Sequence, residues 1–251
     1  GDHRDLHSFP TTTLFRSHAF GTVVGYETPR YYGIRFGVEA SHVINLWDNG
    51  LTTMDPLTGK SAKWEKEMYN YLNSNLNYPI FRLNQLYLQY SNNIVNAKIG
   101  KIDINKGPLF LKRGGRMNPF LYQGIWTEFG SEKKLLLNLA WINGVAPRGL
   151  NSWYSMNEAI GLNNNGVEPN GTAADYKGKA STKGIGVIGL QSQVVNSIRL
   201  NVWNYYFHNL MNTLWLQTDF DFRKFQFGVQ YVLQTPDGFQ SKIDYENRYI
   251  Q

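Results

Sequence analysis

The residue types that most often carry catalysis or metal binding are sparse in this sequence of 251 residues. It contains no cysteine, which excludes disulfides, cysteine-ligated zinc sites and thiol nucleophiles. Five histidines are present, and no two of them have metal-ligand spacing on one strand face: His3, His7, His18, His42 and His208. We therefore expect no metal site.

Two other patterns could carry chemistry. Asp219 and Asp221 lie two residues apart on one face of an expected strand, as the paired acids of a glycoside hydrolase could, although such pairs are more often part of a polar wall. Residues 184–189 match the dinucleotide pattern G-x-G-x-x-G, but they continue as a strand and lack the acidic residue expected about twenty positions on. We interpret these glycines as strand residues. No catalytic constellation remains, so we predict a protein that is not an enzyme and has no cofactor.

The composition excludes several classes of protein. Charged residues make up 18% of the chain, below the roughly 25% typical of soluble domains, while aromatic residues reach 15%. A coiled coil, a helical repeat and a disordered tail are therefore excluded. The net charge is +6, but the basic residues are dispersed, so we expect no nucleic-acid partner. The opening residues 1–4 lack the apolar region of a signal peptide, so we expect that a signal was removed or that the chain was cut upstream.

The dominant period of the sequence is two, which is typical of β-strands. Large apolar residues alternate with small or polar ones most clearly in residues 32–41, 196–205, 212–222 and 224–234. Weaker alternation covers residues 19–26, 81–90, 94–103, 122–130, 134–142 and 184–192. These are roughly ten strands of about ten residues, the length of a tilted strand that crosses a bilayer. Strands of soluble sheets are usually about five or six residues long.

The connections between these strands alternate in length. Long polar loops cover residues 47–78, 105–119 and 146–182, and brief helical stretches are expected at 62–74 and 151–160. Short turns are expected at 28–30, 92–93, 130–132, 195–196, 209–210 and 223. Short turns on one rim and long extracellular loops on the other are typical of outer-membrane barrels. We therefore predict an all-β fold, with residues 1–251 forming one antiparallel transmembrane β-barrel domain.

The polar faces of the strands then become the expected pore wall. Strand parity assigns to it Arg35, Glu39, Arg82, Lys98 and Arg199. Alternation alone fits equally well with the solvated face of a soluble antiparallel sheet. Tryptophan and tyrosine residues near the strand ends, where interfacial girdles lie, favour the membrane interpretation.

Several short segments resemble one known family in their order and spacing. They are residues 25–33 (GYETPRYYG), 82–90 (RLNQLYLQY), 98–101 (KIGK), 115–119 (GRMNP), 146–148 (APR), 153–155 (WYS) and 158–161 (EAIG). From residue 25 to residue 222 the chain is similar to OprD-type outer-membrane porins, closest to the versions found in Bacteroidetes and related Gram-negative bacteria.

The resemblance implies a barrel of about eighteen strands in the outer membrane of a Gram-negative bacterium. Small hydrophilic, often carboxylate-bearing solutes would diffuse through it, with the lipid bilayer and lipopolysaccharide around it. It also implies that Arg116 is a constriction residue and Arg148 a loop residue near the mouth. The family commonly has an acid just before its Arg-Met-x-Pro motif, whereas this chain reads Arg113-Gly114-Gly115, which would favour anions over cations.

A barrel of that size needs roughly three hundred residues or more, so we expect this chain to be most of the first half of a porin. A complete ten-stranded barrel is the alternative. Two other functions stay open at this point: a secreted soluble β protein that binds or hydrolyses polysaccharide, and a surface adhesin or barrel component of an export complex. Either a homo-oligomer or a larger membrane complex would fit the porin interpretation.

Overall fold

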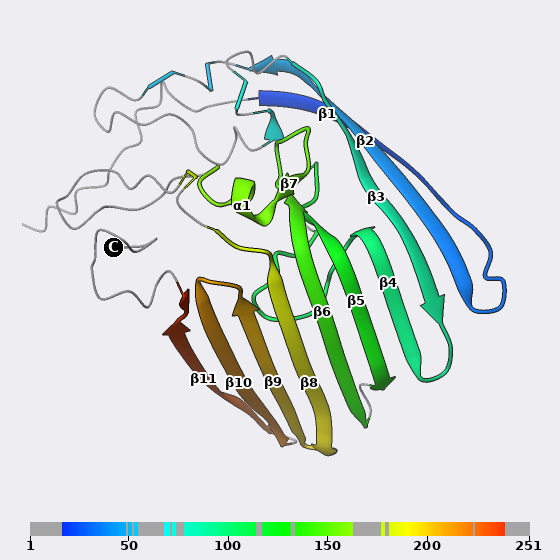
Figure 1. Cartoon of the computed structure of the whole chain (residues 1–251), viewed down its shortest axis with the longest axis vertical. Coiled ribbons are helices and arrows are strands. Elements are labelled where there is room, and N and C mark those ends of the chain that lie inside the picture. The colour runs from blue at the N-terminus through cyan, green and yellow to red at the C-terminus, as the bar shows by residue number, and fades with distance from the viewer. Residues whose placement is uncertain are drawn as a thin grey trace, which may run out of the picture.

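The described part of the chain forms one antiparallel sheet. The computed structural model describes residues 17–48, 50–51, 53–54, 68–70, 72–73, 78–113, 117–131, 134–162, 177–178, 181–222 and 224–238. Figure 1 shows the strands side by side in a single curved wall. No helix among these residues is long and apolar enough to span a membrane.

Each long strand pairs with its neighbours in the sequence, in the order β1-β2-β3-β4-β5-β6-β8-β9-β10-β11, and the short β7 pairs with β6. The elements are β1 (Ser17–Glu27), β2 (Ile34–Asp48), β3 (Ile80–Ser91), β4 (Val95–Ile102), β5 (Leu121–Ser131), β6 (Leu135–Ala146), β7 (Tyr154–Ser155), α1 (Met156–Ala159), β8 (Ile185–Val195), β9 (Ile198–Phe207), β10 (Met211–Phe222) and β11 (Phe225–Pro236). All ten strands expected from the alternation are present, and the prediction of an antiparallel β fold is confirmed.

Three expectations about local structure need correction. The strand expected to end at residue 41 continues to Asp48, because the whole of β1 pairs with β2, up to Asp48. The helix expected at 151–160 shrinks to the four residues of α1, because Tyr154 and Ser155 pair with β6 instead. The short turn at Asn209 was expected on the rim opposite the long loops. It lies on the same rim as the long loops, where the Asn209 side-chain amide donates to the Ser181 carbonyl. The helix expected at 62–74 falls mostly outside the described residues.

The two faces of the sheet differ in chemistry. We call the face that carries Arg35 the inner face, and the opposite one the outer face. One row of cross-strand partners on the outer face shows its character: Phe36, Leu88, Ile99, Ile125 and Trp141 are all apolar and 37–55% exposed. Leaving aside Asp48 at the end of β2, Lys101 is the one charged residue of the described strands that the register places on the outer face.

The inner face carries the buried core of the molecule. An aromatic cluster from β5 and β9 packs there against the connection between β4 and β5, with Trp126, Trp203 and Tyr205 at its centre. Phe110 of that connection lies edge-on to the rings of Trp126 and Tyr205. The buried core therefore lies between the wall and an inward-folded connection, not between two layers of secondary structure.

Gly189 of β8 lies opposite Trp203 of β9, and a methyl group at residue 189 would overlap the Trp203 indole. That indole is 2% exposed and stacks on Trp126 and Tyr205, so it has little room to move. We expect Gly189→Ala to lower the free energy of unfolding by about 1–3 kcal/mol, the usual range for overpacking. Urea unfolding in detergent measures it.

Gly186→Ala is the matched control on the same strand, because a methyl group there would meet the Trp141 ring at an ordinary 3.6 Å. Equal losses of stability in the two variants would show that the register of β8 against β9 is wrong.

Candidate functional site

A row of hydrogen-bonded polar side chains crosses the inner face from β1 to β5. We call it the polar belt, and its members are Glu27, Arg35, Gln89, Asn96 and Glu128. Arg35 donates to Glu27 at 2.6 Å and to Gln89 at 3.0 Å. Gln89 donates to Asn96, which donates in turn to Glu128 at 3.3 Å. The side chains of the belt therefore satisfy one another along the wall, and Glu128 also forms an ion pair at 3.2 Å with Lys106 of the connection between β4 and β5.

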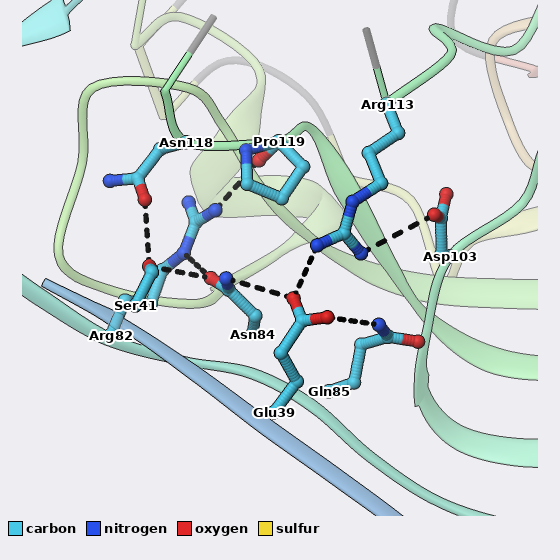
Figure 2. Close-up of polar contacts among 9 residues, drawn as sticks. All are labelled: Glu39, Ser41, Arg82, Asn84, Gln85, Asp103, Arg113, Asn118 and Pro119. Atoms are coloured by element: carbon cyan, nitrogen blue, oxygen red, sulfur yellow. Dashed lines mark hydrogen bonds and ion pairs between the residues drawn. The ribbon is translucent and has the colours of Figure 1, made fainter. Parts of the chain in front are cut away.

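A second cluster surrounds Glu39 of β2, as Figure 2 shows. Its carboxylate accepts hydrogen bonds from Asn84 and Gln85 at 3.1 Å each and from Arg113 at 2.6 Å. The register of β2 against β3 shifts at Glu39, so that these two consecutive residues of β3 both reach the same carboxylate. A β-bulge re-aims side chains in this way.

Arg113 brings the connection between β4 and β5 to this cluster. Its guanidinium lies 3.5 Å from Asp103 as well as 2.6 Å from Glu39. Burial by itself would lower the pKa of Arg113, but the hydrogen bond and charge of Glu39, with those of Asp103, raise it above its usual value. Arg113 therefore stays charged and is neutralised by two carboxylates.

The same connection is held against the inner wall at several other points. The Tyr122 hydroxyl accepts from the Leu111 N–H at 2.7 Å. Arg148, from the connection after β6, donates to the Lys112 carbonyl at 2.8 Å. With Phe110 inserted among the aromatic rings of the wall, the stretch from 109 to 113 has a defined path across the inner face. It narrows the space on that side of the sheet.

Arg82 of β3 fastens the far end of the connection. Its side chain is 1% exposed and donates to the Pro119 carbonyl at 2.6 Å, the Pro147 carbonyl at 2.7 Å and the Leu150 carbonyl at 3.3 Å. One buried guanidinium therefore ties two long connections to the wall, as its contact with Pro119 in Figure 2 illustrates.

A cavity of about 340 Å³ lies between residues 105–112 and the inner faces of β8, β9 and β10. Gln191, Asn201 and Gln217 are cross-strand partners in one row of its wall. Trp203 and Trp215 line it beside them, and Lys106 and Lys112 face it from the connection. Lys106 pairs with Glu128 at 3.2 Å. This surface offers hydrogen-bond donors and acceptors, aromatic faces and the charge of Lys112.

No family model matches the sequence, and no curated protein matches it. Comparison with solved structures gives 44 matching chains. The OccD3 (OpdP) structure from Pseudomonas aeruginosa superposes with a TM-score of 0.61 at 13% identity, over 88% of this chain and 45% of that chain. A BenF-like porin from Pseudomonas fluorescens gives a TM-score of 0.61 at 11% identity, over 88% of this chain and 52% of that one. This chain has the fold of an outer-membrane β-barrel porin wall.

The outer membrane protein OpdK from Pseudomonas aeruginosa also has a TM-score of 0.61, at 11% identity, and covers 88% of this chain and 52% of its own. The chain thus spans about half the length of the structures that it matches. These neighbours are porins of the OprD/Occ family, which agrees with the resemblance seen in the sequence motifs at the level of the fold.

Within the sheet, the residues predicted by strand parity all lie on the inner face. Arg35 belongs to the polar belt, and Glu39 is the centre of the second cluster. Arg82 shares Asn84 with Glu39 but is covered by the connections that it binds. The Lys98 ammonium lies 4.7 Å above the Tyr87 ring. Arg199 is exposed and pairs across strands with Asp219, away from both clusters.

The two residues assigned through the family motif have different outcomes. Arg148 lies in the connection after β6, where it binds the backbone of the inward-folded segment. Arg116 lies outside the described residues, so its position at the constriction stays a prediction.

Several members of the two clusters were not predicted. Glu27 lies one residue beyond the expected end of its strand, and extending the alternation would have found it. Asp103 and Arg113 flank an aperiodic connection, and the bulge at Asn84 and Gln85 has no sequence signal that we recognise. Glu39 and Asp103, which both contact Arg113, are acids that lie outside the motif.

The three carbonyl contacts of Arg82 lead to a prediction about the two connections. We expect Arg82→Met to destabilise the protein by about 1.5–3 kcal/mol or more, because hydrogen bonds from a buried charged group are lost. Trypsin should then cut faster at Arg113 and Arg148. Digestion of the folded protein in detergent micelles, followed by mass spectrometry, measures this.

Arg199→Met removes an equal charge from an exposed position on the same inner face. If it accelerates cleavage as much as Arg82→Met does, Arg82 does not anchor the two connections.

Proposed function

We propose that this chain forms part of the wall of a porin in the outer membrane of a Gram-negative bacterium, through which small hydrophilic solutes diffuse passively. The observation that carries the proposal is that the apolar face of the sheet is the exposed one, the reverse of a soluble sheet. Exposed apolar side chains cover the outer face, while nearly all charged strand residues lie on the inner one. A soluble sheet would bury its apolar face, whereas a bilayer requires this one outside.

The edges of the sheet support a larger barrel. In the described sheet, β1 and β11 are the two edge strands and do not pair with each other. Unpaired backbone groups at the edge of an open sheet cannot be satisfied in hydrocarbon. We therefore propose that further strands complete a barrel similar in size to the matched porins, of which this chain covers about half. This favours the partial-chain prediction over a complete ten-stranded barrel.

The inner face supports passive conduction of polar solutes. Its side chains can replace part of a solute's hydration as it passes the inward-folded segment, which requires no chemical step. Arg113 is neutralised by Glu39 and Asp103, and Arg35 by Glu27, so the field for an anion comes from the other described bases of the inner side: Lys98, Arg199 and Arg148. We propose that carboxylate-bearing solutes are favoured for this reason.

Single-channel recording in planar bilayers tests the proposal. The protein purified from the envelope fraction should migrate differently in SDS electrophoresis before and after boiling, and should give steady ohmic conductance in potassium chloride. Full solubility without detergent, together with sugar-dependent quenching of tryptophan emission, would instead favour the soluble polysaccharide-binding alternative.

The charges near the constriction predict a change in ion selectivity. Arg113→Met uncovers the carboxylates of Glu39 and Asp103, so the reversal potential in a potassium chloride gradient should move toward the cation value. Arg116→Gln should weaken anion preference as well. Lys224→Gln removes the same charge from a residue that follows the last short turn, and should leave the reversal potential near the wild-type value. Identical reversal potentials for all three variants would contradict this assignment of the inner face.

The assignment of the outer face predicts a defect in membrane assembly. Phe36 is 40% exposed on the outer face, and Phe36→Lys should cost about 2–4 kcal/mol if this residue lies near the bilayer midplane. The fraction that folds into lipid vesicles, followed by the heat-modifiable band, should fall. Gln217→Lys places the same side chain on the inner face beside Asp219 and should fold normally. Equal yields from the two variants would refute the face assignment.

A further inference from the structure

The outer face contains a groove of about 480 Å³ across β3, β4, β5 and β6. One part of it is apolar: Ile99, Ile125 and Trp141 are neighbours in one cross-strand row, and each is partly exposed. The other part is polar: Lys101 and Gln123 are cross-strand partners two residues farther along, toward the rim of the long loops, with Asn143 close by in the lining. The groove is therefore amphipathic along the direction of the strands.

Lys101 is the charged exception on the outer face, and its ammonium is held in a fixed place. The Nζ atom donates to Gln123 Oε1 at 2.8 Å and lies 4.2 Å above the ring of Trp153. Trp153 is itself positioned by its N–H, which donates to the Leu83 carbonyl at 2.7 Å. Leu83 lies on the part of β3 that does not pair with β4. Among the described contacts, the ammonium uses one of its three N–H donors in a hydrogen bond.

The height of Lys101 places it in the half of the apolar band nearer the long loops, from where its long side chain can extend toward a lipid headgroup. It is the seventh residue of β4, which rises from the short turn at 92–94. At about 3.3 Å per residue this is roughly 23 Å along the strand, or roughly 18 Å of height at the usual barrel tilt. The apolar band of an outer-membrane barrel is about 25 Å tall. Lys101 therefore lies past the middle of the band, on the side of the long loops.

We propose that this groove binds the lipid A part of lipopolysaccharide, with a phosphate on Lys101 and an acyl chain along Ile99, Ile125 and Trp141. The inference rests on the proposed function, which directs the long loops outward and so places the groove in the outer leaflet. An ionisable side chain on a lipid-facing surface is costly and marks a specific partner. A phosphate monoester carries negative charge that no headgroup amine neutralises, so it complements the ammonium.

Native mass spectrometry of the full-length protein in a neutral detergent tests the proposal, with purified lipid A as the probe. Wild type should retain lipid A, and Lys101→Met should bind it roughly fivefold more weakly, the effect of one basic residue near a membrane surface. Lys101→Arg should restore binding.

Lys98→Met is the matched control, because it removes the same charge three residues away on the opposite face of β4. Gln123→Leu, which leaves the charge in place, should weaken binding less than Lys101→Met.

Three results would overturn the proposal: equal affinity of wild type and Lys101→Met, equal binding of dephosphorylated lipid A, or complete release of lipid A by inorganic phosphate, which would indicate a site for the free ion. Conductance measured on the same preparation separates this inference from the proposed function. Channels that conduct but bind lipid A independently of Lys101 overturn the lipid site alone, whereas absent conductance would contradict the porin itself.

Discussion

The structure depends on one constraint: where the connections cover the polar inner face of this single-layered wall, the buried polar groups need partners in the protein. Unpaired polar groups are costly once water is excluded from them. The polar belt meets this constraint by linking side chains of five successive strands. Arg35 pairs with Glu27 of the neighbouring strand, and Glu128 pairs with Lys106 of the connection between β4 and β5. The Glu39 cluster meets it by recruiting Arg113 from the connection between β4 and β5.

The same constraint explains why the inward-folded segment has a defined path. Where the inner face carries aromatic rings instead of charges, Phe110 covers them. Where the wall presents a buried guanidinium, at Arg82, the backbone carbonyls of two connections supply the acceptors. The wall and the connections are therefore interdependent, because each buries groups that the other must satisfy. The path of the inward-folded segment is therefore specified by the strands as much as by the segment itself.

The strands were predictable because a sheet with one apolar and one polar face has a period of two in every strand. Parity placed Arg35, Glu39 and Lys98 on one face, and the register places them together as well. The contacts among connections were not predictable. The Arg113–Glu39 pair depends on the path of a segment without sequence periodicity. The bulge at Asn84 and Gln85 adds one residue to β3, and no residue type in the sequence indicates it. The short helix α1 was overestimated because pairing of Tyr154 and Ser155 with β6 took precedence over local helix preference.

Under the proposed function, charge balance links the wall to selectivity. The family motif lacks its acid in this chain, and absence of that acid alone would argue for a strongly anion-favouring constriction. Glu39 and Asp103 change that conclusion, because both contact Arg113 and offset its charge from outside the motif. The net field therefore depends on bases at greater distances, which water and salt screen more effectively over lengths beyond about 8–10 Å. Under the proposed function, selection of a solute then relies more on short-range contacts than on long-range attraction. Such contacts are offered by the carboxamides of Gln191, Asn201 and Gln217 beside two indoles.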